Sequence, residues 1–257
     1  EVLISSTSIG YGVSMALSGK SLLGAGTSIY KDISYFTPTC PKYLTSDSMF
    51  DSHYLMSYYD SAQDASTIVL MELSNPRDTT VLASSTFPSE VYDIATLNQQ
   101  TGIFVAINQD LDETQDTATV IAGKVTSTNS QFTYGIPVVY GGRYSVDPSI
   151  TRLSDDSFAI IYFDTNAQNS TSVITKYGRV NPDLSITLSE GVLVSVDTNN
   201  GIHYTAVGLT PTLYLIGYYN GTGSIEMKTG PLSVMTVVIE DETPVLGATS
   251  VLENKIA

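Results

Sequence analysis

The chain has 257 residues, with 11 lysines and arginines against 26 aspartates and glutamates, and its net charge at pH 7 is −15. This charge argues against nucleic acid or an anionic membrane surface as an electrostatic partner. No apolar run approaches the roughly 18 residues of a membrane-spanning helix. The single cysteine, Cys40, has no second cysteine in the chain to pair with. At this length an apolar core can stabilise a fold without disulfides.

Short predicted strands recur in one order from the N-terminus onward. Residues 1–7, 12–17 and 22–29 have the pattern of three strands. Opening strands are then predicted at 31–36, 92–97, 147–153 and 203–209. Each opening strand precedes an apolar strand that ends in an acid or amide, at 55–60, 104–110, 159–164 and 213–220. Third strands are predicted at 67–73, 117–125, 171–180 and 223–232, and fourth strands at 79–87, 132–140, 186–196 and 237–246.

This recurrence has a period of about 55 residues, which is the range of propeller blades. The residues that close the second strands, Asp60, Asp110, Asp164 and Asn220, follow one another at intervals of 50, 54 and 56 residues. The pattern resembles the β-propellers as a class, and no motif matches a named propeller family. The resemblance implies an all-β fold with four-stranded blades, either five blades or a segment of a longer propeller chain.

We expect one domain over residues 1–257. Its blades are predicted at approximately 1–29 (partial), 30–88, 89–141, 142–198 and 199–247. The first blade is partial because residues 1–7 match a second strand. Residues 248–257 lie where a first strand is expected, so they either complete the opening blade and close a five-bladed ring or begin a further domain.

Polar residues recur on the opening strands, which line the central channel of a propeller. Asp32, Asp93, Asp147 and His203 occupy nearly the same place in four blades. Converging carboxylates are what glycoside hydrolysis requires, with one acid protonated and the other ionised. Alternatively, the repeated acid accepts backbone N–H groups at the start of each blade. A cation or ligand in the channel mouth is the third possibility.

One of these opening strands, Asp147-Pro148-Ser149-Ile150, resembles that of five-bladed arabinanase-like glycosidases. The resemblance implies that Asp32, Asp93 and Asp147 are the catalytic residues of a glycosidase. That family also uses a general-acid glutamate on an inner strand, and none of the predicted inner strands here contains one. The hydrogen-bonding interpretation of the acids is therefore favoured.

A second acidic segment follows one of the apolar strands. Asp110, Asp112, Thr114 and Asp116 alternate so that several oxygens could surround one Ca²⁺ ion, which prefers six to eight oxygen ligands. The segment lacks the glycine and the closing glutamate of an EF-hand. A solvated acidic turn is the alternative.

Aromatic residues are the predicted ligand contacts. Tyr58, Tyr162 and Tyr218 lie beside the blade hairpins, where their rings could contact sugars or proteins, and His203 lies at the channel mouth. Two N-glycosylation triplets begin at Asn169 and Asn220, at matching places in two successive blades. They favour a secreted or cell-surface glycoprotein.

These observations predict a non-catalytic extracellular propeller that acts as a structural or adhesion module in a surface assembly or filament. Its expected partners are glycans, other surface proteins or copies of itself, with Ca²⁺ as the one candidate cofactor. The competing hypothesis is a glycoside hydrolase of the five-bladed arabinanase-like type.

Overall fold

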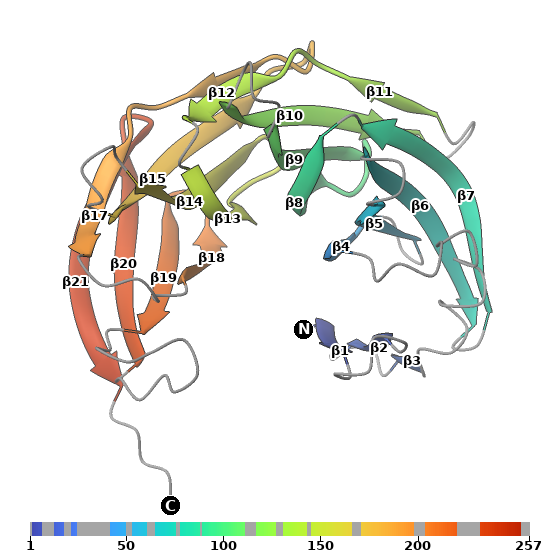
Figure 1. The fold of residues 1–257 in the computed structure, drawn as a ribbon, viewed down its shortest axis with the longest axis horizontal. Helices are drawn as coiled ribbons and strands as arrows, with labels where there is room; N and C mark the ends of the chain where they lie inside the picture. The colour runs from blue at the N-terminus through green and yellow to red at the C-terminus, as the bar shows by residue number, and fades with distance from the viewer. Residues whose placement is uncertain are drawn as a thin grey trace, which may run out of the picture.

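The described part of the chain is built from β-strands and contains no helix. The computed structural model describes residues 2–6, 13–17, 22–24, 42–49, 53–60, 65–75, 78–87, 89–110, 117–126, 131–142, 145–165, 171–197, 204–219 and 232–252. The described strands form five antiparallel sheets that follow one another along the chain (Figure 1).

The first two sheets come from the N-terminal third. The N-terminal sheet contains β1 (Val2–Ser6), β2 (Val13–Leu17) and β3 (Leu22–Gly24) in sequence order. The second blade contains β4 (Lys42–Ser48), β5 (His53–Asp60), β6 (Ala65–Asn75) and β7 (Asp78–Phe87).

The next two blades have a fourth strand that is broken into two pieces. The third blade contains β8 (Glu90–Asn98), β9 (Ile103–Asp110), β10 (Thr117–Val125), β11 (Phe132–Tyr134) and β12 (Val138–Gly141). The fourth blade contains β13 (Ser145–Arg152), β14 (Ser157–Thr165), β15 (Thr171–Val180), β16 (Ile186–Leu188) and β17 (Val192–Asp197). Both pieces pair with the same third strand, so the blade order is kept.

The fifth blade contains β18 (Tyr204–Thr210), β19 (Leu213–Tyr219), β20 (Leu232–Glu240) and β21 (Thr243–Leu252). Its last two strands meet at a tight two-residue turn. Asp241 and Glu242 both have positive φ, 48° and 60°, as a type I′ hairpin requires.

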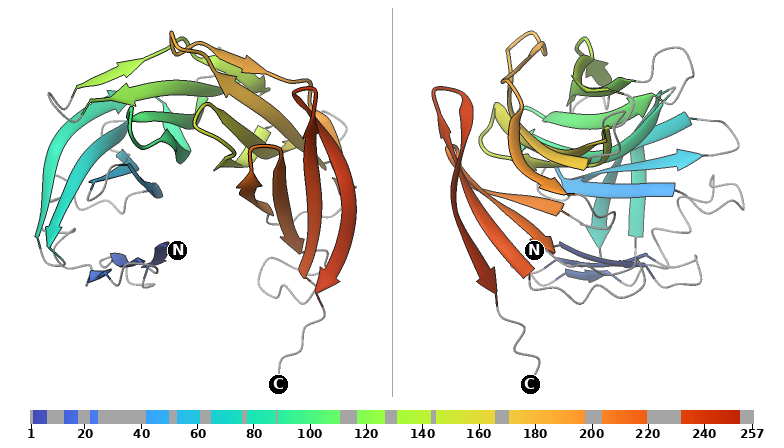
Figure 2. Two further views of the ribbon diagram at one scale, coloured as in Figure 1. Left: turned by 180° about the vertical axis from the view of Figure 1, so that it is seen from behind. Right: turned by 60° about the vertical axis from the view of Figure 1, so that its left-hand side comes forward.

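The second to fifth blades are arranged radially around an arc, with the first strand of each blade innermost and the last outermost (Figure 1). Two further views show the same order from behind and from the side (Figure 2). The prediction of an all-β propeller with four-stranded blades is confirmed.

The apolar core lies between neighbouring blades, because each sheet is buried on the face it turns to the next. One cluster joins the second and third blades through Leu55, Ile68 and Phe104. Two further clusters join the third blade to the fourth and the fourth to the fifth. Blade-on-blade packing therefore stabilises the arc.

Three strand predictions are wrong. The first strand of the second blade is β4, at 42–48, where the sequence pattern predicted 31–36. In the fifth blade the third and fourth strands, β20 and β21, begin nine and six residues later than the predicted 223–232 and 237–246. Apolar alternation fits several local registers, and pairing across the sheet selects one of them.

The expected closing strand at 248–257 begins inside β21. Residues 248–252 extend the outermost strand of the fifth blade, where Thr249 pairs with Met235 and Leu252 with Leu232. They are therefore not a first strand, and residues 253–257 lie outside the described residues. Ring closure by this tail stays a prediction.

Candidate functional site

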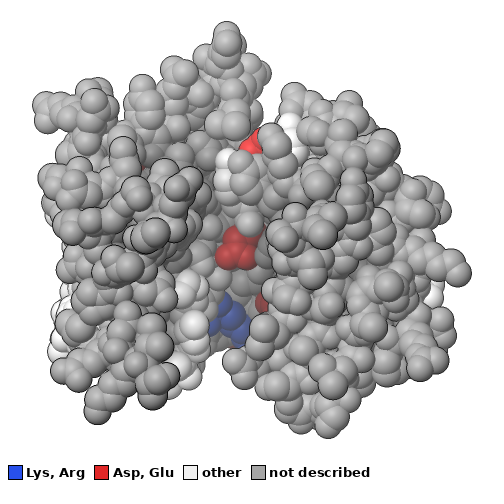
Figure 3. All heavy atoms as spheres, turned by 60° about the horizontal axis from the view of Figure 1, so that its bottom comes forward, with Lys and Arg blue, Asp and Glu red and all other residues white. Residues whose placement is uncertain are grey.

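The innermost strands of the four blades together line a groove on the concave side of the arc. The groove has a volume of about 400 Å³. Its lining comes from β4, β8, β13 and β18 and the turn after β8: Asp47, Ile94, Ala95, Thr96, Gln99, Ile150, Thr151, Arg152, Ala206, Val207 and Gly208. Figure 3 looks into the hollow of the molecule, where acidic and basic surface lie close together. This groove is the candidate functional site.

Polar side chains at the groove connect one blade to the next. Asp47 Oδ2 accepts the Thr96 backbone N–H at 2.7 Å. Thr151 Oγ1 accepts the Gly208 backbone N–H at 2.8 Å. Asp47 and Thr151 hold equivalent places in their blades. Each lies on the first strand of its blade and pairs with a residue of the second strand, five positions before the acid that ends that second strand. The same repeat position thus makes the same contact at two interfaces.

At the interface between the third and fourth blades this position is Ala95, which has no side-chain acceptor. Asp93, two residues earlier and on the same side of the strand, takes over the contact. Its Oδ2 accepts the Ile150 N–H of the fourth blade at 3.0 Å, and its Oδ1 accepts the Ile94 N–H at 2.9 Å. Both carboxylate oxygens of Asp93 are therefore engaged by backbone donors.

Of the three predicted catalytic residues, the structure describes the side chain of Asp93 alone. Asp93 lies on β8, next to the groove-lining Ile94, and hydrogen-bonds to the fourth blade. Asp147 lies on β13, of which the structure describes only the backbone at this residue, and Asp32 and His203 lie outside the described residues. The strand predicted around Asp32 is replaced by β4, so Asp47 is the acid that the second blade contributes to the groove.

Sequence reasoning missed the polar residues that line the groove, Arg152 and Gln99 among them. Arg152 is a cation in the lining, and its guanidinium donates to Asp155 at 2.6 Å and to the Ser154 carbonyl at 3.4 Å. Gln99 lies in the turn after β8. Arg152 is the residue before the last in the predicted opening strand 147–153, and a search for polar residues one position before the repeated leucine would have found it.

Two of the tyrosines predicted to contact a ligand, Tyr58 and Tyr162, are buried and present little ring surface. Tyr162 is 4% exposed, and its hydroxyl donates to the Tyr140 carbonyl at 3.0 Å. Burial, and then the nearby Asp164 carboxylate, raise the pKa of Tyr162 to about 12. Tyr58 is 9% exposed. The Tyr162 ring lies in the apolar cluster between the third and fourth blades, because alternate strand positions face the neighbouring blades. Tyr218 is on β19 and is described only as backbone.

The predicted calcium and glycosylation positions fall mostly outside the described residues. Asp110 ends β9 and is described as backbone, whereas Asp112, Thr114 and Asp116 lie outside. Asn169 and Asn220 also lie outside, as does Cys40. Within the described strands and turns, no three His, Cys, Asp or Glu side chains gather as a metal site would require. The Ca²⁺ site and the glycans stay predictions.

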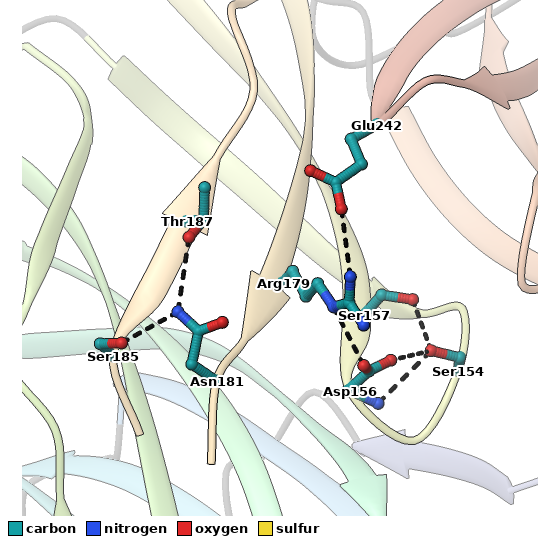
Figure 4. Close-up of polar contacts among 8 residues, drawn as sticks. All are labelled: Ser154, Asp156, Ser157, Arg179, Asn181, Ser185, Thr187 and Glu242. Atoms are coloured by element: carbon teal, nitrogen blue, oxygen red, sulfur yellow. Dashed lines mark hydrogen bonds and ion pairs between the residues drawn. The ribbon is translucent and has the colours of Figure 1, made fainter. Parts of the chain in front are cut away.

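A separate polar network lies on an exposed rim between the fourth and fifth blades. Arg179 contacts Asp156 at 3.1 Å and Glu242, in the β20–β21 turn, at 3.2 Å. Figure 4 shows Arg179 between these two acids. Because Arg179 and Glu242 are about half exposed, this contact is a weak connection between blades and lies outside the groove lining.

Among the residues that the structure describes, none forms a helix long and apolar enough to cross a membrane.

The sequence matches no protein-family model. No curated protein matches it either. Solved structures do match. The α-L-arabinofuranosidase Arb93A from Fusarium graminearum, in complex with an iminosugar inhibitor, is similar with a TM-score of 0.58 and 10% identity over 86% of this chain and 68% of that one. A mutant of the same enzyme with the inhibitor has a TM-score of 0.54 and 10% identity over 82% of this chain and 68% of the mutant.

A hypothetical selenium-binding protein from Sulfolobus tokodaii is similar with a TM-score of 0.56 and 7% identity over 97% of this chain. The chain spans 63% of the length of that protein. At these identities the similarities concern the fold, and they agree with the propeller arrangement of the blades.

Proposed function

We propose that this chain is a non-catalytic β-propeller module that binds carbohydrate in the inner groove and acts in adhesion or assembly at a cell surface. The observation that carries the proposal is that the inner-strand carboxylates with described side chains accept backbone N–H groups. Asp47 and Asp93 each accept a backbone N–H from the following blade. Acids held in this way stabilise blade packing, whereas a glycosidase needs one acid to donate a proton and another to attack or activate water.

The groove itself supports carbohydrate as the ligand class. A volume of about 400 Å³ is within the range of small-molecule sites. Arg152 and Gln99 supply polar groups for hydroxyls, and Val207, 53% exposed, supplies apolar contact for the C–H face of a sugar ring. The fold similarity to an arabinofuranosidase solved with an iminosugar adds support for a sugar-sized ligand.

Extracellular location, glycosylation at Asn169 and Asn220, and Ca²⁺ at Asp110, Asp112, Thr114 and Asp116 belong to the same proposal. They rest on the sequence pattern. Partners beyond glycans are other surface proteins or further copies of the chain.

The test is a glycan array probed with the purified chain, with calcium and with a chelator, followed by a check of every bound glycan for cleavage. We expect binding without cleavage. Arg152→Ala should weaken binding by about tenfold or more, because a charge-assisted hydrogen bond contributes roughly 1.5–3 kcal/mol. Arg179→Ala is the matched control, since it removes an exposed, paired arginine outside the groove lining, and it should leave binding unchanged.

Equal binding by the wild type and Arg152→Ala would show that the ligand does not bind in the groove. If no glycan binds in either buffer, carbohydrate is the wrong ligand class, and protein partners replace it.

A glycosidase is the second candidate, favoured by the fold similarity to the arabinofuranosidase. Its catalytic acids would be Asp93 and Asp147, with Asp32 as a third. Cleavage of an arabinose-containing polysaccharide that is lost in Asp147→Asn, in a variant that keeps the wild-type melting temperature, would establish this alternative.

A further inference from the structure

Arg152 is the only cation among the described residues that line the groove. Its guanidinium has N–H donors on three nitrogens, and two of these nitrogens have partners: Nε donates to the Ser154 carbonyl and Nη2 to Asp155. Nη1 has no partner among the described residues. The side chains of Arg152 and Asp155 are 44% and 67% exposed, so an anion in solution can reach the guanidinium. The groove therefore contains one cationic group with donors to spare.

Thr151, the residue before Arg152, lines the groove as well and adds a neutral donor. Its Oγ1 accepts the Gly208 backbone N–H at 2.8 Å, which leaves the hydroxyl hydrogen to donate. No described residue accepts that hydrogen. Two neighbouring residues of β13 thus offer donors to the groove, and a ligand that supplies acceptor oxygens fits them.

The first strand of the fifth blade places an apolar side chain beside these donors. Gly208 lies so close to the Arg152 backbone that a Cβ at position 208 would overlap the Arg152 carbonyl. Val207, the neighbour of Gly208, is 53% exposed and lines the groove. A sugar ring has C–H groups on its faces and oxygens at its edge. Val207 can therefore contact a ring face while Arg152 binds a group that projects from the ring edge.

The charges around the groove limit a ligand to one anionic group. Arg152 comes from the fourth blade, whereas the second blade contributes the Asp47 carboxylate to the lining. Figure 3 shows acidic and basic surface together in this hollow. The chain also carries a net charge of −15, so its field repels a polyanion such as a polyuronate or a heavily sulfated glycan. A single carboxylate fits the one guanidinium, which can bind it through two parallel N–H···O bonds.

We propose that the groove selects a sugar with a single carboxylate, a hexuronic acid residue in an otherwise neutral glycan, and that Arg152 binds this carboxylate. The inference rests on the proposed carbohydrate binding and names the sugar class for that same site. The carboxylate binds at Nη1 and shares the cation with Asp155. The Thr151 hydroxyl donates to an oxygen of the sugar, and Val207 contacts the face of the ring.

The test uses pairs of oligosaccharides that end in galacturonic, glucuronic or mannuronic acid. The second member of each pair is the carboxyl-reduced form, which is neutral and otherwise identical. Isothermal titration calorimetry with the full chain gives both dissociation constants. We expect at least one acidic sugar to bind about tenfold more tightly than its reduced form, the factor that a charge-assisted hydrogen bond provides.

Variants then assign this ratio of affinities to one residue. In Arg152→Gln the ratio falls to about one. Arg152→Lys keeps the charge but not the paired N–H groups, so the ratio falls by less, and this variant decides the question if Arg152→Gln does not fold. Arg179→Gln is the matched control. It removes an exposed arginine that is paired with Asp156 and Glu242 outside the groove lining, and it leaves the ratio unchanged.

Two results would overturn the inference and leave carbohydrate binding in place. One is equal affinity for the acidic and reduced members of every pair that binds. The other is a ratio as large in Arg152→Gln and Arg152→Lys as in the wild type, because another group would then bind the carboxylate. If no pair binds while another glycan on the array does, the sugar class is wrong and the proposed function stands. If no glycan binds at all, both fail together.

Discussion

Asp93 allows the sharpest test of how the blades hold together. Its carboxylate accepts the Ile94 N–H at 2.9 Å and the Ile150 N–H of the fourth blade at 3.0 Å. Asp93→Ala removes both acceptors. Each backbone N–H left without a partner costs about 1–3 kcal/mol, with part of that recovered by water because Asp93 is only half-buried. A loss of roughly 2–4 kcal/mol lowers the melting temperature of a chain of this size by about 5–15 °C.

Differential scanning calorimetry of three variants measures this effect. Asp93→Asn keeps one acceptor oxygen in nearly the same shape, so its loss should be about half that of Asp93→Ala. Asp155→Ala is the control, because the Asp155 side chain is 67% exposed and its ion pair with Arg152 contributes at most about 0.5–1 kcal/mol. If Asp93→Ala and Asp155→Ala melt at the same temperature, Asp93 does not connect the third and fourth blades in the way the hydrogen bonds indicate.

The remaining predictions concern packing and alkaline stability. Gly178→Ala places a Cβ 2.5 Å from Cε2 of the buried Phe158 ring, so it should destabilise the fold by about 1–3 kcal/mol in urea unfolding, whereas Gly142→Ala, with open space around it, should change nothing. Equal midpoints for the two variants would contradict the close ring-to-backbone packing. Burial, opposed in part by the Thr175 hydrogen bond, raises the pKa of Tyr214 to about 12 from its ordinary 10.0. The folded state therefore favours the neutral phenol, and the stability is full below pH 10 and is lost as the pH rises from 10 to 12. Thermal unfolding between pH 8 and 12 should show a smaller fall for Tyr214→Phe than for the wild type, and identical pH profiles would refute the assignment.

The sequence alone determined the architecture, because a period of about 55 residues is a property of the chain itself. Asp110, Asp164 and the repeated Leu97, Leu153 and Leu209 mark equivalent places without any knowledge of contacts. Periodicity also predicted the second strands closely, as β9 and β14 show. It failed at β4, where the pattern around residues 31–36 looked equally strand-like. Local alternation reports that a segment suits a strand, and only pairing decides which segment is used.

The tertiary structure alone decided what the polar residues do. Asp47 and Thr96 are 49 residues apart, and Asp93 and Ile150 are 57 apart, so no local pattern connects them. An aspartate on an inner strand has the same appearance in the sequence whether it faces a substrate or accepts a neighbour's backbone N–H. Likewise the tyrosine at 162 fits an exposed ligand contact or a core ring until the blades pack. These roles depend on which groups the fold brings within hydrogen-bonding distance, and that is set by the packing of one blade on the next.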